Sequence, residues 1–232
     1  MHPTASSPAI LFQSVLLPLT GLVLGMRHAF DRDHLAAVTH FISLEPDPLK
    51  SAWFGFRWAL GHAVTVLTLG SLILILHLKF DPAFERYAEV AVGVTLILLG
   101  LWRLALLWQE RRHTHRHAHL HKEHSHPHSH EPGRGHVHRF APTLVGMVHG
   151  ASGTAEVFVL IPITLISTTW LAYLYIGLFS LGCAFTMSLY GYVVGRFYRR
   201  ASVTGQRLYR ALVIMTSTSG VALGLVWILK NL

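Results

Sequence analysis

Six apolar stretches dominate the chain, and each is about as long as the ~20 residues that a helix needs to cross a bilayer. They lie at residues 8–27, 53–78, 86–108, 141–166, 169–195 and 208–230. With 52% hydrophobic and 13% charged residues, the chain is too apolar for an ordinary soluble domain. The sequence therefore predicts an all-α polytopic membrane protein with about six transmembrane helices.

The first apolar stretch continues beyond the length of one span. Residues 35–44 are apolar but too few to span alone, whereas residues 8–44 are too many for one straight span. Between the two parts, the segment GLVLGMRHAFDRDHLAAV (residues 21–38) holds two arginines, two aspartates and two histidines at its centre. We therefore expect a break in the helix near this charged segment, followed by a kinked continuation or a re-entrant half-helix.

A segment of different composition separates the third and fourth predicted spans. Eleven of the 18 histidines lie between His113 and His138, among very few apolar residues. Because such a segment cannot form a core, we predict a disordered loop whose composition is typical of metal binding. It divides the chain into a first three-helix membrane half (1–108), the histidine-rich loop (109–140) and a second three-helix half (141–232).

The basic residues predict the orientation in the membrane. Most lie in the connections after the first, third and fifth spans, whereas Lys79, Arg86 and Lys230 lie on the other side. Cytoplasmic loops carry an excess of Lys and Arg, so we place the histidine-rich loop in the cytoplasm and both termini outside. The net charge of +8 is thus explained by the basic loops of a protein embedded in a lipid bilayer, and we expect no nucleic-acid partner. We expect a multi-pass cell-membrane protein, in the inner membrane of a Gram-negative cell.

Two histidines and two aspartates fall within seven positions of the charged segment: His28, Asp31, Asp33 and His34. On an unbroken helix His28, Asp31 and His34 share one broad face, and Asp33 falls nearly opposite. A locally unwound turn could bring His28, Asp33 and His34 together, as in transporters that build ion sites from interrupted helices. The simpler alternative is a set of interfacial residues paired with the neighbouring arginines.

Further polar side chains lie inside the predicted spans. His62 lies in the second span, where it could face a cavity or simply donate to a neighbouring carbonyl. His149 and Glu156 are seven residues apart in the fourth span and so share one stripe, and an intramembrane carboxylate needs a cation, a proton or a partner. Imidazole suits Ni²⁺, Co²⁺, Zn²⁺ and Cu²⁺. We therefore predict a divalent metal site formed by His28, Asp31, Asp33, His34, His62, His149 and Glu156.

These motifs resemble those of the nickel/cobalt transporter superfamily. RHAFDRDH matches its H-x4-D-H signature through His28, Asp33 and His34, and GHAVTVL resembles its G-H element through His62. VHGASGTAE looks like the later small-residue motif of urease-accessory-type nickel permeases. The resemblance covers most of the chain. Ser152 stands where the eight-span permeases have aspartate, which places the chain nearer the shorter branches.

The resemblance implies transport of Ni²⁺, or of Co²⁺, with the H-x4-D-H residues in recognition and cytoplasmic nickel chaperones as partners. The metal is then the cargo, and no cofactor is expected. An inward-negative potential favours entry of a dication by roughly 4.6 kcal/mol per 100 mV. Since no Walker-type loop is present to bind ATP, we expect uptake driven by the potential. Efflux stays open, because histidine-rich loops also occur in the nickel/cobalt efflux branch.

Two other classes of protein remain open from the residues alone. A membrane-embedded zinc hydrolase would hold zinc through His and Asp, but no general base or substrate pocket can be identified. A membrane-anchored metal buffer or sensor would use only the loop, which the polar residues in three spans argue against. The single cysteine, Cys183, excludes a paired-cysteine metal or redox site. We expect a transporter and not an enzyme.

Overall fold

The structure is a computed structural model that describes residues 16–77, 81–111, 140–152, 162–163, 166 and 168–232. These residues form seven α-helices and no strand. The helices are α2 (Leu17–His28), α3 (Arg32–Ile42), α4 (Pro48–Leu76), α5 (Pro82–Arg111), α6 (Ala141–His149), α9 (Thr169–Thr204) and α10 (Gln206–Asn231). Four of them, α4, α5, α9 and α10, are long and apolar enough to cross a membrane. The described part of the chain is thus all-helical and has the apolar helices of a membrane protein, which confirms the prediction from hydropathy.

The predicted number of six spans stays a prediction. Helices α4, α5, α9 and α10 coincide with four of the predicted spans. The first predicted span, 8–27, begins outside the described residues, and α2, its described part, has 12 residues. The fourth predicted span, 141–166, also extends beyond the described part of the chain.

The expectation of one continuous helix from residue 141 was wrong, because α6 ends at His149. Gly150 and Ala151 form a turn, and the Ser152 hydroxyl donates to the carbonyl oxygen of His149 at 2.9 Å. A glycine followed by a serine whose side chain binds the backbone favours the end of a helix.

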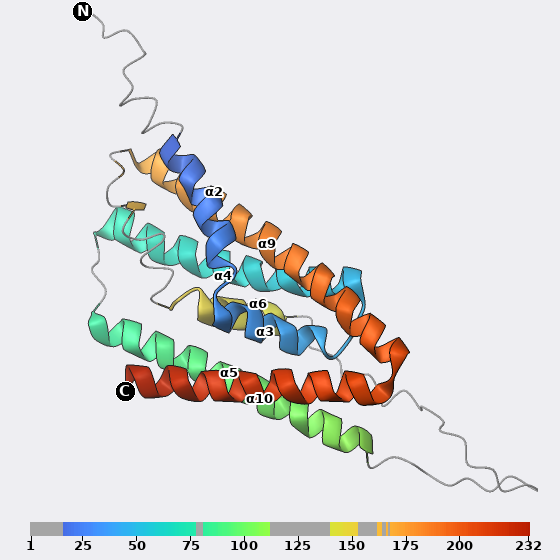
Figure 1. Cartoon of the computed structure of the whole chain (residues 1–232). Helices are drawn as coiled ribbons and strands as arrows, with labels where there is room; N and C mark the ends of the chain where they lie inside the picture. Colours follow the sequence, from blue (N-terminus) through green and yellow to red (C-terminus); the bar gives the residue numbers. More distant parts are fainter. Residues whose placement is uncertain (1–15, 78–80, 112–139, 153–161, 164–165, 167) are drawn as a thin grey trace, which may run out of the picture.

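The described helices form two layers with short helices between them (Figure 1). In one layer α9 packs along α2 and α4, and in the other α5 packs along α10. The largest interfaces therefore join helices that precede the histidine-rich loop with helices that follow it. The division of the chain into 1–108, 109–140 and 141–232 stays a prediction, since residues 112–139 lie outside the described part.

Helix α3 lies inside the bundle although it has only 11 residues. It contacts α4, α5, α6, α9 and α10, and most of its side chains are buried. Helix α6 packs mainly on α4 (Figure 1). Helix α3 is thus enclosed by the other helices, whereas α6 buries only the face with Pro142, Gly146 and His149. The buried polar residues of both helices therefore lie in the interior of a membrane protein.

The expected break in the first apolar stretch is present. Helix α2 ends at His28, Ala29 and Phe30 form a turn, and α3 begins at Arg32. Asp31 precedes α3 with extended backbone (φ −61°, ψ 140°), and its carboxylate makes no capping hydrogen bond to the helix. The charged segment is therefore the junction of two helices.

The outward faces of the long helices are apolar. On α4, large exposed apolar side chains recur every three or four positions: Leu49, Trp53, Phe56, Leu60, Val64 and Leu67. Helix α9 exposes Phe185, Leu189 and Tyr192 at the same spacing. Such stripes on helices of this length face lipid.

Candidate metal site

Four histidines from four helices meet in the interior. His28 ends α2, His34 lies in the first turn of α3, His62 lies in the middle of α4, and His149 ends α6. All four side chains are fully buried. The Nε2 atoms of His28 and His62 are 3.2 Å apart, and the ring centroids of His34 and His149 are 5.8 Å apart. One ring nitrogen from each of His28, His34 and His62 lies within 4.8 Å of the others.

Glycines let α4 and α6 approach closely enough to bring two of these histidines together. A Cβ at Gly61 would overlap the carbonyl oxygen of Thr143, and a Cβ at Gly146 would overlap the carbonyl oxygen of Trp58. The two backbones are therefore in direct contact where the helices cross, as small residues permit in membrane proteins. Since His62 follows Gly61 and His149 lies one turn after Gly146, this crossing determines how near the two imidazoles lie.

Asp33 is the buried carboxylate of the cluster. Its side chain is 1% exposed, and its Oδ2 atom lies 3.5 Å from His34 Nε2 and 4.0 Å from His149 Nε2. Asp33 also belongs to the first turn of α3, where the positive end of the helix dipole stabilises a negative charge. The carboxylate thus lies beside two imidazoles, those of His34 and His149.

Hydrogen bonds of the Nδ1 atoms determine which ring nitrogens face the cluster. His34 Nδ1 lies 3.2 Å from the carbonyl oxygen of His28, and His149 Nδ1 lies 2.9 Å from that of Val145. A carbonyl only accepts, so we assign the proton of both rings to Nδ1 and the lone pair to Nε2. The Asp31 carboxylate makes an ion-pair contact with His28, with 2.9 Å between Asp31 Oδ2 and His28 Nδ1.

The cluster therefore presents the Nε2 lone pairs of His34 and His149 together with the Asp33 carboxylate, whereas the Nε2 atoms of His28 and His62 are hydrogen-bonded to each other. Metal-binding histidines are arranged in this way, with the other ring nitrogen donating to a carbonyl or a carboxylate. A group of converging acceptors in an apolar interior is stabilised by a cation. The arrangement can thus strip water from a cation and hold it with nitrogen and oxygen ligands.

Aromatic side chains form the walls of the cluster. The Trp58 ring lies 4.6 Å from that of His34, and the Phe179 ring lies 5.3 Å from that of His28, centroid to centroid. Both aromatic residues are fully buried. Sequence analysis did not single them out, although Trp58 lies four residues before His62 and so shares its face of α4. Nothing in the sequence points to Phe179.

The remaining predicted site residues have other positions. Asp31 is partly exposed and binds His28, so it orients a histidine of the cluster. It is also near enough to Asp33 and His34 for these three to form a second group of candidate ligands. Glu156 lies outside the described residues.

A second buried polar group, which sequence analysis did not single out, holds the other end of α3. The Arg103 side chain is 1% exposed, and its Nε and Nη2 atoms donate to Ser43 Oγ at 2.9 Å and to the Ser43 carbonyl oxygen at 3.0 Å. The Tyr209 hydroxyl also donates to this carbonyl oxygen, at 2.6 Å. Ser43 is the C-cap of α3, so a guanidinium stabilises the negative end of this helix.

Comparison with known proteins gives a family and a relative. The family described as "Cytochrome C biogenesis protein transmembrane region" matches residues 20–219, which include all four histidines of the cluster. The urease accessory protein UreH of Bacillus sp. (strain TB-90) is 27% identical over 175 residues, which is 75% of this chain and 74% of that protein. No solved structure matches the chain. The likeness to UreH agrees with the resemblance to urease-accessory-type proteins, and membership of the nickel/cobalt transporter superfamily stays a prediction.

Proposed function

We propose that this chain, which belongs to the family of cytochrome c biogenesis protein transmembrane regions, carries a divalent transition metal across the membrane. The proposal rests on one observation: four buried histidines from four helices lie together, with the Nε2 atoms of His34 and His149 facing the buried Asp33 carboxylate. Nickel is the proposed cargo, with cobalt as the alternative. The choice of these metals comes from the resemblance of the His28, Asp33 and His34 motif to nickel/cobalt transporters.

The ligand set supports a transition metal. Several imidazoles with one carboxylate suit Ni²⁺, Co²⁺, Zn²⁺ or Cu²⁺, whereas Mg²⁺ and Ca²⁺ prefer oxygen ligands. Metal–imidazole bonds of about 2.0–2.1 Å at bond angles of 90–110° separate two nitrogens by about 2.8–3.4 Å. The 3.2 Å between the Nε2 atoms of His28 and His62 falls in this range.

In the proposed mechanism, a hydrated ion exchanges its water molecules for His28, His34 and His62, and Asp33 offsets part of its charge. His149 completes the set, and Asp31 keeps His28 in the ligating tautomer. Because the four histidines are fully buried, the ion enters and leaves only when the surrounding helices part. The turn at residues 29–31 adjoins the site and is the proposed point of movement.

Uptake is the proposed direction. An inward-negative potential favours inward movement of a dication by a free energy of roughly 4.6 kcal/mol per 100 mV. No ATP is needed for this movement. Efflux would have to oppose this potential and would need a coupled ion. Redox chemistry by a pair of thiols within these 232 residues has no support, since Cys183 is the single cysteine.

The test is the flux of radioactive Ni²⁺ through the purified full chain in liposomes, measured in both directions at fixed pH and membrane potential. We expect uptake that grows with an inside-negative potential. His62→Ala should lower the rate at least tenfold, because it removes one ligand from the cluster. The matched control is His77→Asn, which changes an exposed histidine at the end of the same helix and should leave the rate unchanged. Transport by His62→Ala at the normal rate would disprove the site.

A further inference from the structure

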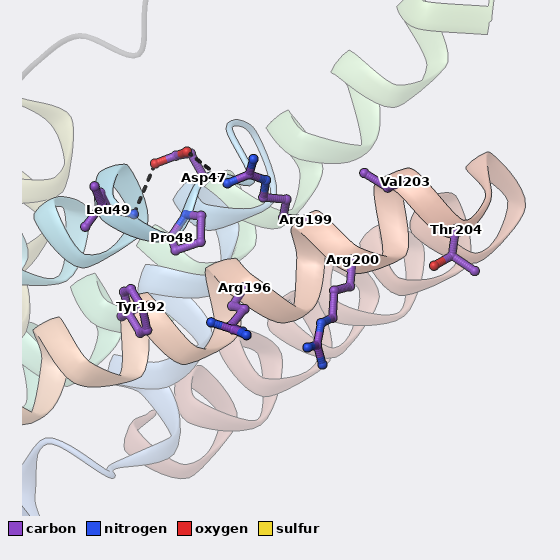
Figure 2. A pocket seen from close by; sticks show the side chains of 9 residues that line it. All are labelled: Asp47, Pro48, Leu49, Tyr192, Arg196, Arg199, Arg200, Val203 and Thr204. Carbon is purple, nitrogen blue, oxygen red and sulfur yellow. Dashed lines mark hydrogen bonds and ion pairs between the residues drawn. The ribbon is translucent and has the colours of Figure 1, made fainter.

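A basic pocket lies at the junction of the start of α4 and the end of α9 (Figure 2). Its volume is about 560 Å³. Its walls include three arginines and three apolar or aromatic side chains: Arg196, Arg199, Arg200, Leu49, Tyr192 and Val203. None of them belongs to the histidine cluster.

Two glycines of α9 form the contact that creates this pocket. A Cβ at Gly191 would overlap the carbonyl oxygen of Ser51, and a Cβ at Gly195 would overlap the Ser51 side chain. The first turn of α4 therefore rests directly on α9. The adjacent face of α9, beside the start of α4, carries side chains at three- and four-residue spacing: Tyr192, Arg196, Arg199, Arg200 and Val203.

The pocket has a surplus of positive charge. Arg199 Nη1 lies 3.9 Å from Asp47 Oδ2, and the other carboxylate oxygen of Asp47 accepts from the amides of Leu49 and Lys50 at the start of α4. In the part of the chain that the structure describes, Arg196 and Arg200 pair with no carboxylate, and both side chains are exposed. Figure 2 shows them extending away from the Asp47–Arg199 pair. Two guanidinium groups are thus accessible to an anion.

The rim of the pocket is apolar and continues the lipid-facing surface. Leu49 is 74% exposed and is the first residue of the apolar stripe on α4. Tyr192 is the last residue of the corresponding stripe on α9. On α9 the exposed Phe197 and Val203 lie among and after the arginines. The arginines therefore lie where the stripe of α4 ends and beside exposed apolar side chains of α9, which is the setting expected for phospholipid headgroups.

We propose that this pocket binds the phosphate of an anionic phospholipid, with the acyl chains lying along the stripes of α4 and α9. Guanidinium groups bind phosphate oxygens through paired N–H donors, and basic pockets between transmembrane helices bind anionic headgroups. A free phosphate ion would use the arginines alone and would gain nothing from Leu49 and Tyr192. The combination of charge and apolar rim therefore favours the lipid.

The test is native mass spectrometry of the delipidated full chain, titrated with phosphatidylglycerol and with phosphatidylcholine of identical acyl chains. We expect tighter binding of phosphatidylglycerol, whose net charge is negative. Arg196→Gln/Arg200→Gln should weaken this binding about 25-fold, at about fivefold for each arginine at a membrane surface. Arg196→Lys/Arg200→Lys keeps the charge and should retain most of the binding.

The matched control is Arg86→Gln/Lys230→Gln, which removes the same charge from exposed positions elsewhere. It should change phosphatidylglycerol binding by less than twofold. Equal binding of the two lipids by the wild type, or equal loss in the Gln pair and the control, would overturn the proposal. So would displacement of phosphatidylglycerol by an equal concentration of inorganic phosphate, which would identify an ion site. Thermal unfolding of each variant in lipid-free detergent shows whether its fold is retained.

Discussion

Asp31 and Asp33 are two residues apart, but they contact different histidines of the cluster. Asp33 is buried and faces the Nε2 atoms of His34 and His149, whereas Asp31 is partly exposed and lies 2.9 Å from the Nδ1 atom of His28. The first carboxylate is positioned to bind a cation and the second to orient a ligand. The two therefore differ in how their substitution should affect metal binding.

At Asp31 we predict a graded loss of metal affinity. Asp31→Ala should weaken Ni²⁺ binding by about 10–100-fold, the usual effect of losing a partner behind a ligating histidine. Asp31→Asn keeps an oxygen acceptor for the His28 Nδ1 proton and should lose much less. Equilibrium dialysis of the purified protein with radioactive Ni²⁺ measures both affinities. Equal losses in the two variants would show that Asp31 acts by its charge and not by orienting His28.

Among the elements, α4 and α6 depend on direct backbone contact at Gly61 and Gly146. We predict that Gly146→Ala lowers the free energy of unfolding by about 1–3 kcal/mol, because its Cβ would overlap the Trp58 carbonyl oxygen. The same separation of helices should move His62 from His149 and weaken Ni²⁺ binding. Thermal unfolding in detergent and equilibrium dialysis measure the two effects.

Gly177→Ala is the control for the glycine contact. Gly177 also lies within a helix, but no atom lies within 4 Å of the position that its Cβ would take. Alanine favours helix over glycine by up to about 1 kcal/mol, so this variant should be as stable as the wild type or slightly more stable. A similar loss of stability in both variants would mean that helix propensity, and not contact, explains the effect.

Helix α3 is held at its C-terminal end by Arg103. We predict that Arg103→Met, which keeps the bulk but removes the donors, lowers the free energy of unfolding by at least about 2 kcal/mol. Tyr209→Phe removes one hydroxyl that donates to the same Ser43 carbonyl and should cost about 1 kcal/mol. Thermal unfolding of the two variants in detergent tests this order. The reverse order would show that Tyr209, and not Arg103, secures the end of α3.

For the whole molecule, the membrane helices and the histidine-rich loop should have separable roles. We predict that replacing the eleven histidines between His113 and His138 by asparagine leaves the initial rate of Ni²⁺ uptake within about twofold. The total Ni²⁺ bound per chain should fall, because these imidazoles no longer bind metal. A loss of uptake as large as that of His62→Ala would assign the loop to the transport path.

The metal bound by the loop should depend on pH. Only neutral imidazole binds metal, and the ordinary imidazole pKa is about 6.5. The extra Ni²⁺ bound by the wild type, compared with the asparagine variant, should therefore be present at pH 7.5 and largely lost at pH 5.5. Equilibrium dialysis at the two pH values gives this difference, and a difference that persists at pH 5.5 would contradict binding by imidazole.

The sequence predicted the membrane helices and the break near the charged segment. Apolar stretches of sufficient length form helices in lipid because every backbone polar group must be satisfied within the segment. The end of α6 at His149 was not predicted, since the apolar pattern continues beyond it. Nor was the role of Arg103, because a basic residue near the end of a span resembles one that simply reaches the interface.

The sequence by itself determined which chemical groups enter the membrane: imidazoles and a carboxylate at a helix break, with a histidine beside a glycine in another helix. Only the tertiary structure decided that His28, His34, His62 and His149 meet, and that Asp33 faces His34 and His149. The physical reason is that local sequence governs the periodicity and breaks of a helix, whereas distances between helices depend on how their surfaces pack. The contacts at Gly61 and Gly146 place α4 against α6, and hydrogen bonds to the Nδ1 atoms then turn the imidazoles toward one another.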